Sequence, residues 1–356
     1  MVIFVHSLDL QDSVKIHCYS IESREIRKND STLRNSFDLY KKHYQVKILI
    51  VCSKTNGKVA PFITEQVESL RASGIELDYF FIEQKGIKGY LQSLSLLKQT
   101  IKTFEPDVIH AHYGLSGLLA NLQRRVPVVT TYHGSDINDP RVKRYSNIAI
   151  RLSHYNIFVS QRLADTIRHK KRYSVIPCGV DMSMFHPIEK QVARESLGWA
   201  QEGKYIVFSG NPEDKVKNFV LAQQAVSLLP NTQLIPLVGF TREEVNLLLN
   251  ATDVALMTSF TEGSPQFIKE AMACNCPIVS TDVGDVKSFI KDIEGCYIAS
   301  YKHDNIEEKI KYALNFAEKN RTNGREQINR MNNTIVAHRL ILIYRTIVIK
   351  HSSNRY

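Results

Sequence analysis

The chain has 356 residues, a net charge of +10, 43% hydrophobic residues and 23% charged residues. A chain of this length is too long for one ordinary hydrophobic core, which predicts two domains. No segment approaches the roughly 20 consecutive apolar residues that span a bilayer, which argues against an integral membrane protein.

The first 45 residues mix charged and polar side chains with little periodicity, so we expect 1–45 to form a poorly ordered N-terminal appendage. They also lack a basic region followed by a long apolar run, which argues against a signal peptide. From Val46 onward, short apolar runs rich in β-branched residues alternate with amphipathic stretches. This pattern predicts strands at 46–52, 75–82, 107–112 and 126–133, with helices at 61–73, 89–104 and 114–124 between them.

Two further strand runs, YNIFVS and YSVIPC, extend this series to residue 178. A second series then predicts strands at 204–210, 233–239, 253–259, 276–282 and 295–300, and residues 304–350 read as helices only. Such βαβ alternation implies parallel sheets wrapped by helices. We therefore predict an α/β protein with two Rossmann-like, doubly wound domains: an N-terminal domain at 46–185, a C-terminal domain at 186–335, and a C-terminal helix at 336–356 that crosses back to the first domain.

The segment TSFTEGSPQFIKEAMACNCPIVSTDVGDV, residues 258–286, carries two glutamates eight positions apart. Ser264 is a favourable N-cap residue and Pro265 suits the first helical position, so we expect a helix from Pro265 to Ala273. Glu262 then precedes the helix, and Glu270 lies roughly 8 Å along its axis. The free amides of the helix start lie between the two carboxylates. This arrangement suits a ligand with an anionic middle and hydroxyl groups at both ends, such as a nucleotide sugar.

Polar residues also follow several predicted strands, where doubly wound sheets bind their ligands. His110 and His112 alternate at the end of one strand and share a face. His133 ends the next strand, and Asp136 follows it in the turn TYHGSD. Gly57 follows the first strand and lets the backbone approach a ligand, although no G-x-G-x-x-G dinucleotide fingerprint accompanies it.

In the second series, FSGNPEDKVKNF ends a strand at Gly210 and brings Lys215 and Lys217 to the next helix start. A lysine in this position can neutralise a diphosphate as a point charge, although a solvated lysine pair is the simpler alternative. The turn after the strand CPIVST, with Asp282 and Asp285, faces the same edge of the sheet.

The six cysteines show no paired framework, which is typical of reduced thiols in a cytoplasmic protein. Cys274 and Cys276 form a Cys-x-Cys, but no second ligand pair follows at zinc spacing. We therefore predict no metal site and no cofactor, and read this pair as buried small residues in a turn.

Four motifs together resemble a family 4 glycosyltransferase of the GT-B type, from about Val46 to the C-terminal helices. They are the Glu-x7-Glu segment EGSPQFIKEAMACNCPIVSTDVG, the linker VIPCGVDMSMFHP, the turn TTYHGSD and the glycine–lysine loop after residue 208. The resemblance implies two Rossmann-like domains facing a cleft. It implies that Glu270 binds the ribose, that Glu262 binds sugar hydroxyl groups, that Gly263, Ser264 and Pro265 approach the donor, and that Lys217, helped by Lys215, holds the diphosphate beside Gly210.

On the N-terminal side, the resemblance places His133 near the donor sugar and Gly57 near the phosphates. We assign His112 and Asp136 to the acceptor side. The implied reaction moves a hexose from a UDP- or GDP-sugar to a glycan or lipid-linked acceptor of the bacterial cell envelope, with retention of anomeric configuration and without a metal. Many members carry an arginine directly after the loop glycine, but here Asn211 occupies that position, so phosphate neutralisation rests on Lys217.

Two other functions stay open. One is a GT-B nucleotide-sugar epimerase or glycan phosphorylase; an epimerase would act on a nucleotide sugar without an acceptor. The other is a non-catalytic, two-domain sugar-binding protein, which would bind without turnover.

Residues 141–172 hold nine Lys and Arg residues and one acid, Asp165. The ordinary interpretation is a solvated face of two surface helices. The alternative is contact with an anionic partner, and a peripheral position at the inner face of the membrane fits it. Nucleic acid is disfavoured because no recognition module or aromatic interleaving accompanies the charge.

If the membrane interpretation holds, each cation adds about 1 kcal/mol of attraction to an anionic bilayer. Most of this attraction should vanish at high salt, because the Debye length falls to about 3 Å at 1 M. Co-sedimentation with liposomes of graded anionic content, comparing the intact protein with a variant carrying glutamate at Lys170, Lys171 and Arg172, measures it. Equal, negligible binding by both proteins would leave only the interpretation that these cations form a solvated face.

Overall fold

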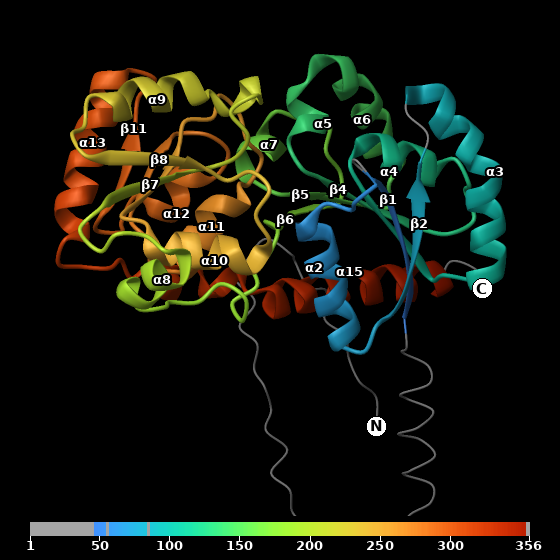
Figure 1. The fold of residues 1–356 in the computed structure, drawn as a ribbon. Coiled ribbons are helices and arrows are strands. Elements are labelled where there is room, and N and C mark those ends of the chain that lie inside the picture. The colour runs from blue at the N-terminus through green and yellow to red at the C-terminus, as the bar shows by residue number, and fades with distance from the viewer. Residues whose placement is uncertain (1–45, 55–56, 84–85, 354–356) are drawn as a thin grey trace, which may run out of the picture. The chain divides into compact units, whose positions relative to one another are not determined.

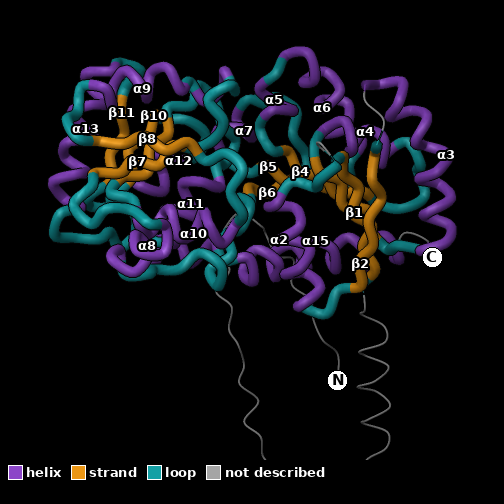
Figure 2. Tube along the Cα trace, in the orientation of Figure 1, coloured by secondary structure: helices purple, strands orange, loops and turns teal. Residues whose placement is uncertain are grey.

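The computed structural model of the chain describes residues 46–54, 57–83 and 86–353. The expected appendage at 1–45 lies outside the described residues. Residues 45–356 form one compact unit that contains two parallel sheets. Figure 1 shows these sheets with their helices, and Figure 2 traces the same elements along the chain. The domain boundaries at residues 185 and 335 stay predictions.

The first sheet has six parallel strands in the order β2-β1-β3-β4-β5-β6. The strands are β1 (Lys47–Ser53), β2 (Glu76–Ile82), β3 (Val108–His112), β4 (Val128–Tyr132), β5 (Tyr155–Phe158) and β6 (Tyr173–Val175). The helices that follow them are α2 (Pro61–Ala72), α3 (Gly86–Phe104), α4 (Gly114–Asn121), α5 (Ser135–Asn138), α6 (Pro140–Leu152) and α7 (Gln161–Asp165). We call this sheet with these helices the N-terminal half.

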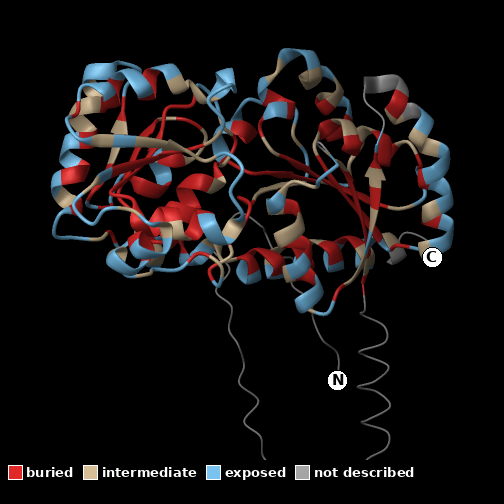
Figure 3. Cartoon of the chain, viewed as in Figure 1, coloured by how far each residue is buried: buried red, intermediate tan, exposed pale blue. Residues whose placement is uncertain are grey.

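Both faces of this sheet are buried, which explains why β1 is apolar from Ile48 to Cys52 instead of alternating with polar residues. Along β1, Ile48, Ile50 and Cys52 belong to the core that includes α2. Leu49 and Val51 point to the other face and pack with residues of α3 and α4. Figure 3 shows the central strands of both sheets as buried, whereas the edge strands β2 and β8 are only partly buried.

The second sheet has five parallel strands in the order β11-β10-β9-β7-β8. They are β7 (Lys204–Phe208), β8 (Thr232–Pro236), β9 (Val254–Met257), β10 (Ile278–Thr281) and β11 (Cys296–Ala299). The surrounding helices are α8 (Lys190–Leu197), η1 (Lys215–Lys217), α9 (Phe219–Ser227), α10 (Arg242–Ala251), α11 (Gln266–Ala273), α12 (Val286–Ile290), α13 (His303–Ala317), α14 (Gly324–Ile328) and η2 (Asn329–Met331). These elements form the C-terminal half.

The last helix, α15 (Asn333–Ser353), packs in the N-terminal half although it follows the C-terminal half in sequence. Val336, Leu340 and Tyr344 join the core of β1 and α2, and the Tyr344 hydroxyl lies 2.6 Å from Nδ1 of His110. The chain therefore crosses between the halves twice. At the crossings the Val180 amide donates to the Met331 carbonyl at 2.9 Å, and the Asn333 amide donates to the Val180 carbonyl at 3.1 Å.

The sequence-based fold is confirmed: all eleven strands of the described residues lie within or next to the predicted ranges, and every paired strand is parallel. One helix start was wrong. Helix α11 begins at Gln266, with Pro265 in extended conformation at the N-cap position, so Ser264 does not cap it. The Ser264 hydroxyl lies instead 3.2 Å from Nζ of the buried Lys269. Within the described residues, no helix is long and apolar enough to cross a membrane.

Candidate active site

The strand orders fix where a ligand can bind. In each sheet the second strand in sequence lies on one side of the first strand, and the third strand lies on its other side. The strand order therefore reverses between β1 and β3 in the first sheet, and between β7 and β9 in the second. Doubly wound sheets bind ligands beyond the carboxyl ends of the strands at such switch points. In the C-terminal half, the loops that follow β7 and β9 carry Gly210 and Glu262.

A hollow of about 630 Å³ opens there, and both halves line it. We call it the central hollow. The N-terminal half contributes apolar or aromatic and polar residues in equal number: Phe62, Tyr113, Val159, Cys178, His133, Ser135, Asn138 and Asp139. The C-terminal half contributes Asp214, Val216, Lys217, Met257 and residues 261–267. Six of the predicted site residues therefore share one hollow: His133, Lys217, Glu262, Gly263, Ser264 and Pro265.

An ion pair joins Lys217 to Glu262 in this hollow, with Nζ and Oε1 2.6 Å apart. The Ser259 hydroxyl donates to the same carboxylate oxygen at 2.9 Å. Lys217 is placed by η1, which is capped by the Asp214 side chain, whose Oδ1 accepts from the Val216 amide at 2.9 Å. The lysine stem passes close to Gly210, where an added Cβ would lie 3.3 Å from Cε. A cation and a carboxylate thus face the hollow together, each about one fifth exposed.

The two halves touch through backbone next to this pair. An added Cβ at Gly263 would lie 2.0 Å from the His133 carbonyl oxygen, and one at Gly134 would lie 2.9 Å from the Gly263 Cα. Gly134 also has a φ of 120°, which side-chain-bearing residues rarely adopt. Glycine is therefore required on both sides of the contact.

His133 lines the hollow, but partners within the N-terminal half engage both of its ring nitrogens. Nε2 lies 3.0 Å from Nδ1 of His112, and Nδ1 lies 3.6 Å from the Cys178 sulfur. Burial, followed by His112 and Lys269, lowers the pKa of His133 well below its usual value, so the ring is neutral at pH 7. Burial also raises the pKa of the Cys178 thiol to about 11. The thiol therefore keeps its proton and can donate a hydrogen bond to Nδ1 of His133.

The two residues assigned to the acceptor side are buried outside the lining of the central hollow. His112 stacks between His110 and His133, and burial lowers its pKa to about 3. Asp136 accepts hydrogen bonds from the amides of His133, Gly134 and Gly114 at 2.9 to 3.0 Å. The Asp136 carboxylate therefore ties two strand-end turns together.

Four other predicted residues, Gly57, Gly210, Lys215 and Glu270, also lie outside the lining of the central hollow. Gly57 is exposed with a φ of 77°, and Lys215 is exposed on η1. Glu270 is 4% exposed on α11, where its Oε1 lies 2.8 Å from Nη2 of Arg242. The structure therefore separates the two glutamates of the Glu-x7-Glu segment into different charge clusters.

Sequence reasoning missed three charged residues around the site, Lys269, Arg242 and Glu65, and gave Asp285 no role. Lys269 is fully buried and donates to the Cys178 carbonyl at 2.7 Å, which ties α11 to the linker between the halves. Burial raises the pKa of Asp285 to about 6, against the lowering effect of Lys269. Arg242 and Glu65 form the cluster around Glu270. Lys269 lies on the helix predicted from Pro265 to Ala273, beside Glu270, whereas nothing in the local sequence marks Glu65 or Arg242.

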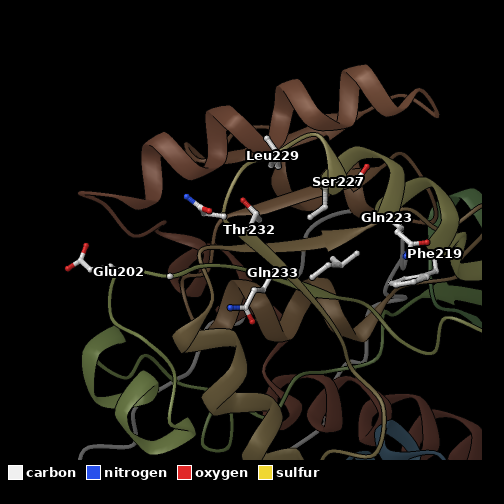
Figure 4. A pocket seen from close by; sticks show the side chains of 11 residues that line it. Glu202, Phe219, Gln223, Ser227, Leu229, Thr232 and Gln233 are labelled. Carbon is white, nitrogen blue, oxygen red and sulfur yellow. The ribbon is translucent and has the colours of Figure 1, made fainter.

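Two more hollows lie in the described residues. A side hollow of about 320 Å³ shares Asn138, Thr261 and Glu262 with the central hollow, and adds Arg162 and Phe260. Glu262 therefore borders both. The edge hollow, of about 760 Å³, lies along β8 and α9 and contains none of the predicted site residues (Figure 4). Among the described residues, no group of three or more His, Cys, Asp or Glu side chains is arranged to hold a metal ion.

Two glycosyltransferase family models match the chain, one over each half. The model of the Glycosyltransferase Family 4 domain matches residues 38–184, and that of Glycosyl transferases group 1 matches residues 206–330. The Bacillus subtilis (strain 168) protein TuaC, named as a teichuronic acid biosynthesis glycosyltransferase, is 26% identical over 55% of this chain and 57% of its own length. The D-inositol 3-phosphate glycosyltransferase of Mycobacterium marinum is 24% identical over 56% of this chain and 53% of its own length. The matches thus span little more than half of these relatives.

Solved structures share the fold. Sucrose-phosphate synthase of Thermosynechococcus elongatus superposes with a TM-score of 0.73 at 15% identity, covering 86% of this chain and 100% of that chain. Anabaena HepE, solved in complex with UDP, superposes with a TM-score of 0.65 at 17% identity, covering 85% of this chain and 100% of its own.

The backbone contact between the halves generates a prediction. Gly263→Ala should lower the free energy of unfolding by about 1–3 kcal/mol, because a Cβ overlapping the His133 carbonyl forces one backbone to shift. Urea unfolding measures it. Ser135→Ala, which shortens an exposed side chain on the same turn, is the control and should change the midpoint little. An unchanged midpoint for Gly263→Ala would mean that the halves are not held in contact there.

Proposed function

Because the chain belongs to the family 4 glycosyltransferases, we propose that it transfers a sugar from a UDP- or GDP-sugar to a glycan or lipid-linked acceptor with retention of anomeric configuration. Its fold is that of the GT-B glycosyltransferases, as the solved structures show. The activity is proposed from the family and from the geometry of the central hollow.

The observation that carries this proposal is the Lys217–Glu262 pair in the central hollow. In the proposed complex, Lys217 holds the diphosphate, and the backbone at Gly263 and Ser264 approaches it. Negative charge develops on the diphosphate as the sugar departs, and a preplaced cation stabilises that charge in a site shielded from water. Anabaena HepE has been solved with UDP and with UDP-glucose, which supports a nucleotide-sugar donor.

Glu262 and His133 face the donor sugar in this proposal. Glu262 accepts hydrogen bonds from sugar hydroxyl groups while Lys217 keeps the carboxylate paired. His133 is neutral, and its hydrogen bond to His112 fixes the orientation of its ring. It therefore acts on the sugar by contact and polarity instead of charge. Exclusion of water between the halves suppresses hydrolysis of the donor.

The acceptor enters from the side hollow, where Glu262, Arg162 and Phe260 meet. An exposed aromatic ring beside polar groups suits a sugar ring, and Phe260 is 57% exposed and stacked on Tyr301. The names of TuaC and of the inositol phosphate enzyme point to cell-envelope or polyol acceptors, and we propose polysaccharide biosynthesis as the setting. The cations at Arg144, Arg168, Lys171 and Arg172 are exposed, as a role at an anionic membrane requires.

The two glutamates should give different phenotypes. Glu270→Ala should weaken binding of the nucleoside diphosphate by about ten- to a hundredfold, because a charged acceptor loses its hydrogen bonds to ribose. Glu262→Ala should leave that binding nearly intact and abolish sugar transfer. Calorimetric titration with UDP, GDP and their sugar nucleotides measures both and identifies the donor. Equal loss of nucleotide affinity in the two variants would refute this division of roles.

We propose that the reaction needs no metal, because Lys217 supplies the positive charge beside the diphosphate. EDTA should leave the rate of transfer unchanged within about twofold. Loss of activity in EDTA that manganese restores would show that a divalent ion performs the task assigned to the lysine.

A further inference from the structure

Arg242 lies between two carboxylates that belong to different halves of the molecule. Its Nη2 is 2.8 Å from Oε1 of Glu270 on α11 and 2.7 Å from Oε1 of Glu65 on α2. Arg242 is the first residue of α10, so Arg242 and Glu270 both belong to the C-terminal half. Glu65 alone comes from the N-terminal half.

This cluster is well shielded from solvent. The side chains of Glu65, Arg242 and Glu270 are 13%, 30% and 5% exposed, and the guanidinium stacks 4.5 Å from the centre of the Phe185 ring. Oε2 of Glu65 and Nε of Arg242 are buried without a hydrogen-bond partner in the described part of the chain. Burial raises the pKa of Glu65. Two carboxylates thus share the Arg242 cation. The Arg242–Glu65 contact forms only when the two halves lie together.

Apart from the buried bond from Lys269 to the Cys178 carbonyl, the polar contacts across the cleft are more exposed. Arg162 and Asp282 approach to 3.7 Å with side chains 55% and 39% exposed, and Asn138 donates to the exposed Thr261 at 2.8 Å. Exposed ion pairs contribute little because solvent screens them. A shielded charge pair is the costlier one to break when the halves separate. Glu65 and Arg242 therefore make the stronger electrostatic tie of the two ion pairs.

The tie also covers a residue that the proposed reaction needs. Glu270 is assigned to the donor ribose, yet its Oε1 is buried, and Glu270 does not line the central hollow. A ribose can reach this carboxylate only if α2 moves away or Arg242 swings aside. Because the Arg242–Glu270 pair lies within one half, it can persist during opening, whereas Glu65 must leave with α2.

We propose that Glu65 and Arg242 form a latch that holds the two halves together over Glu270, and that the nucleotide part of the donor binds only after the latch opens. The inference rests on the proposed function, since it takes Glu270 to be the ribose-binding residue. A protein that is mostly latched binds its ligand with an apparent affinity reduced by the fraction that is open. Weakening the latch should therefore tighten binding, which a merely structural role for Glu65 does not predict.

The test uses Glu65→Gln and Glu65→Ala in the full-length protein. Either change leaves a neutral Arg242–Glu270 pair, whereas removing Arg242 would leave two buried carboxylates side by side and endanger folding. Calorimetry with UDP and with GDP should show a Kd about tenfold lower for Glu65→Ala, the change that 1.4 kcal/mol produces, and a smaller decrease for Glu65→Gln. Glu307→Gln, which breaks a 2.7 Å pair with Lys311 inside α13, is the control and should leave the Kd unchanged.

Amide hydrogen exchange supplies a readout that needs no ligand. Without nucleotide, α2 and the start of α10 should exchange faster in both Glu65 variants than in the wild type, while α13 should not change. An unchanged or higher Kd in both variants, or unchanged exchange in α2, overturns the latch. If wild-type protein binds neither UDP nor GDP, the proposed function fails, and the exchange rates still decide whether Glu65 holds the halves together.

Discussion

The site depends on one contact, in which the backbone at Gly263 lies against the His133 carbonyl with no room for a side chain between them. This contact brings the loop after β9 against the turn after β4. As a result, Glu262 and Lys217 from one half share a hollow with His133, Phe62 and Tyr113 from the other. A larger residue at either glycine would separate these groups, and the polar face would then open to solvent.

The chain limits how the halves can move around that contact. Both crossings between the halves run side by side, with Val180 hydrogen-bonded to Met331 and Asn333. Beyond the second crossing, α15 is anchored by apolar packing and by the bond from Tyr344 to His110. Motion about the paired crossings therefore leaves both cores intact. The ties at the cleft include the glycine contact, two exposed polar contacts, the buried bond from Lys269 to the Cys178 carbonyl and the buried bridge through Arg242.

The fold could be predicted from sequence because its signals are local. Apolar, β-branched runs such as 46–52 form strands buried on both faces, and the alternation with helices dictates parallel pairing. Part of the site was also predictable, since Lys217, Glu262 and His133 follow strands that end at the same edge of their sheets. Glu65 and Arg242 were not predictable, because they meet Glu270 only through the packing of α2 against the C-terminal half. The start of α11 was missed because Ser264 turns toward Lys269 instead of capping the helix.

The structure also shows how the chain provides partners for two glutamates in a shielded cleft. Each carboxylate is paired with a cation from its own half: Glu262 with Lys217 of η1, and Glu270 with Arg242 of α10. A carboxylate has about four acceptor positions on its two oxygens, so one cation leaves places for hydroxyl donors. Because each pair lies within one half, each carboxylate can keep its cation while a ligand arrives. Only Glu65 adds a partner from across the cleft, which makes Glu270 the one of the two whose access is coupled to the position of α2.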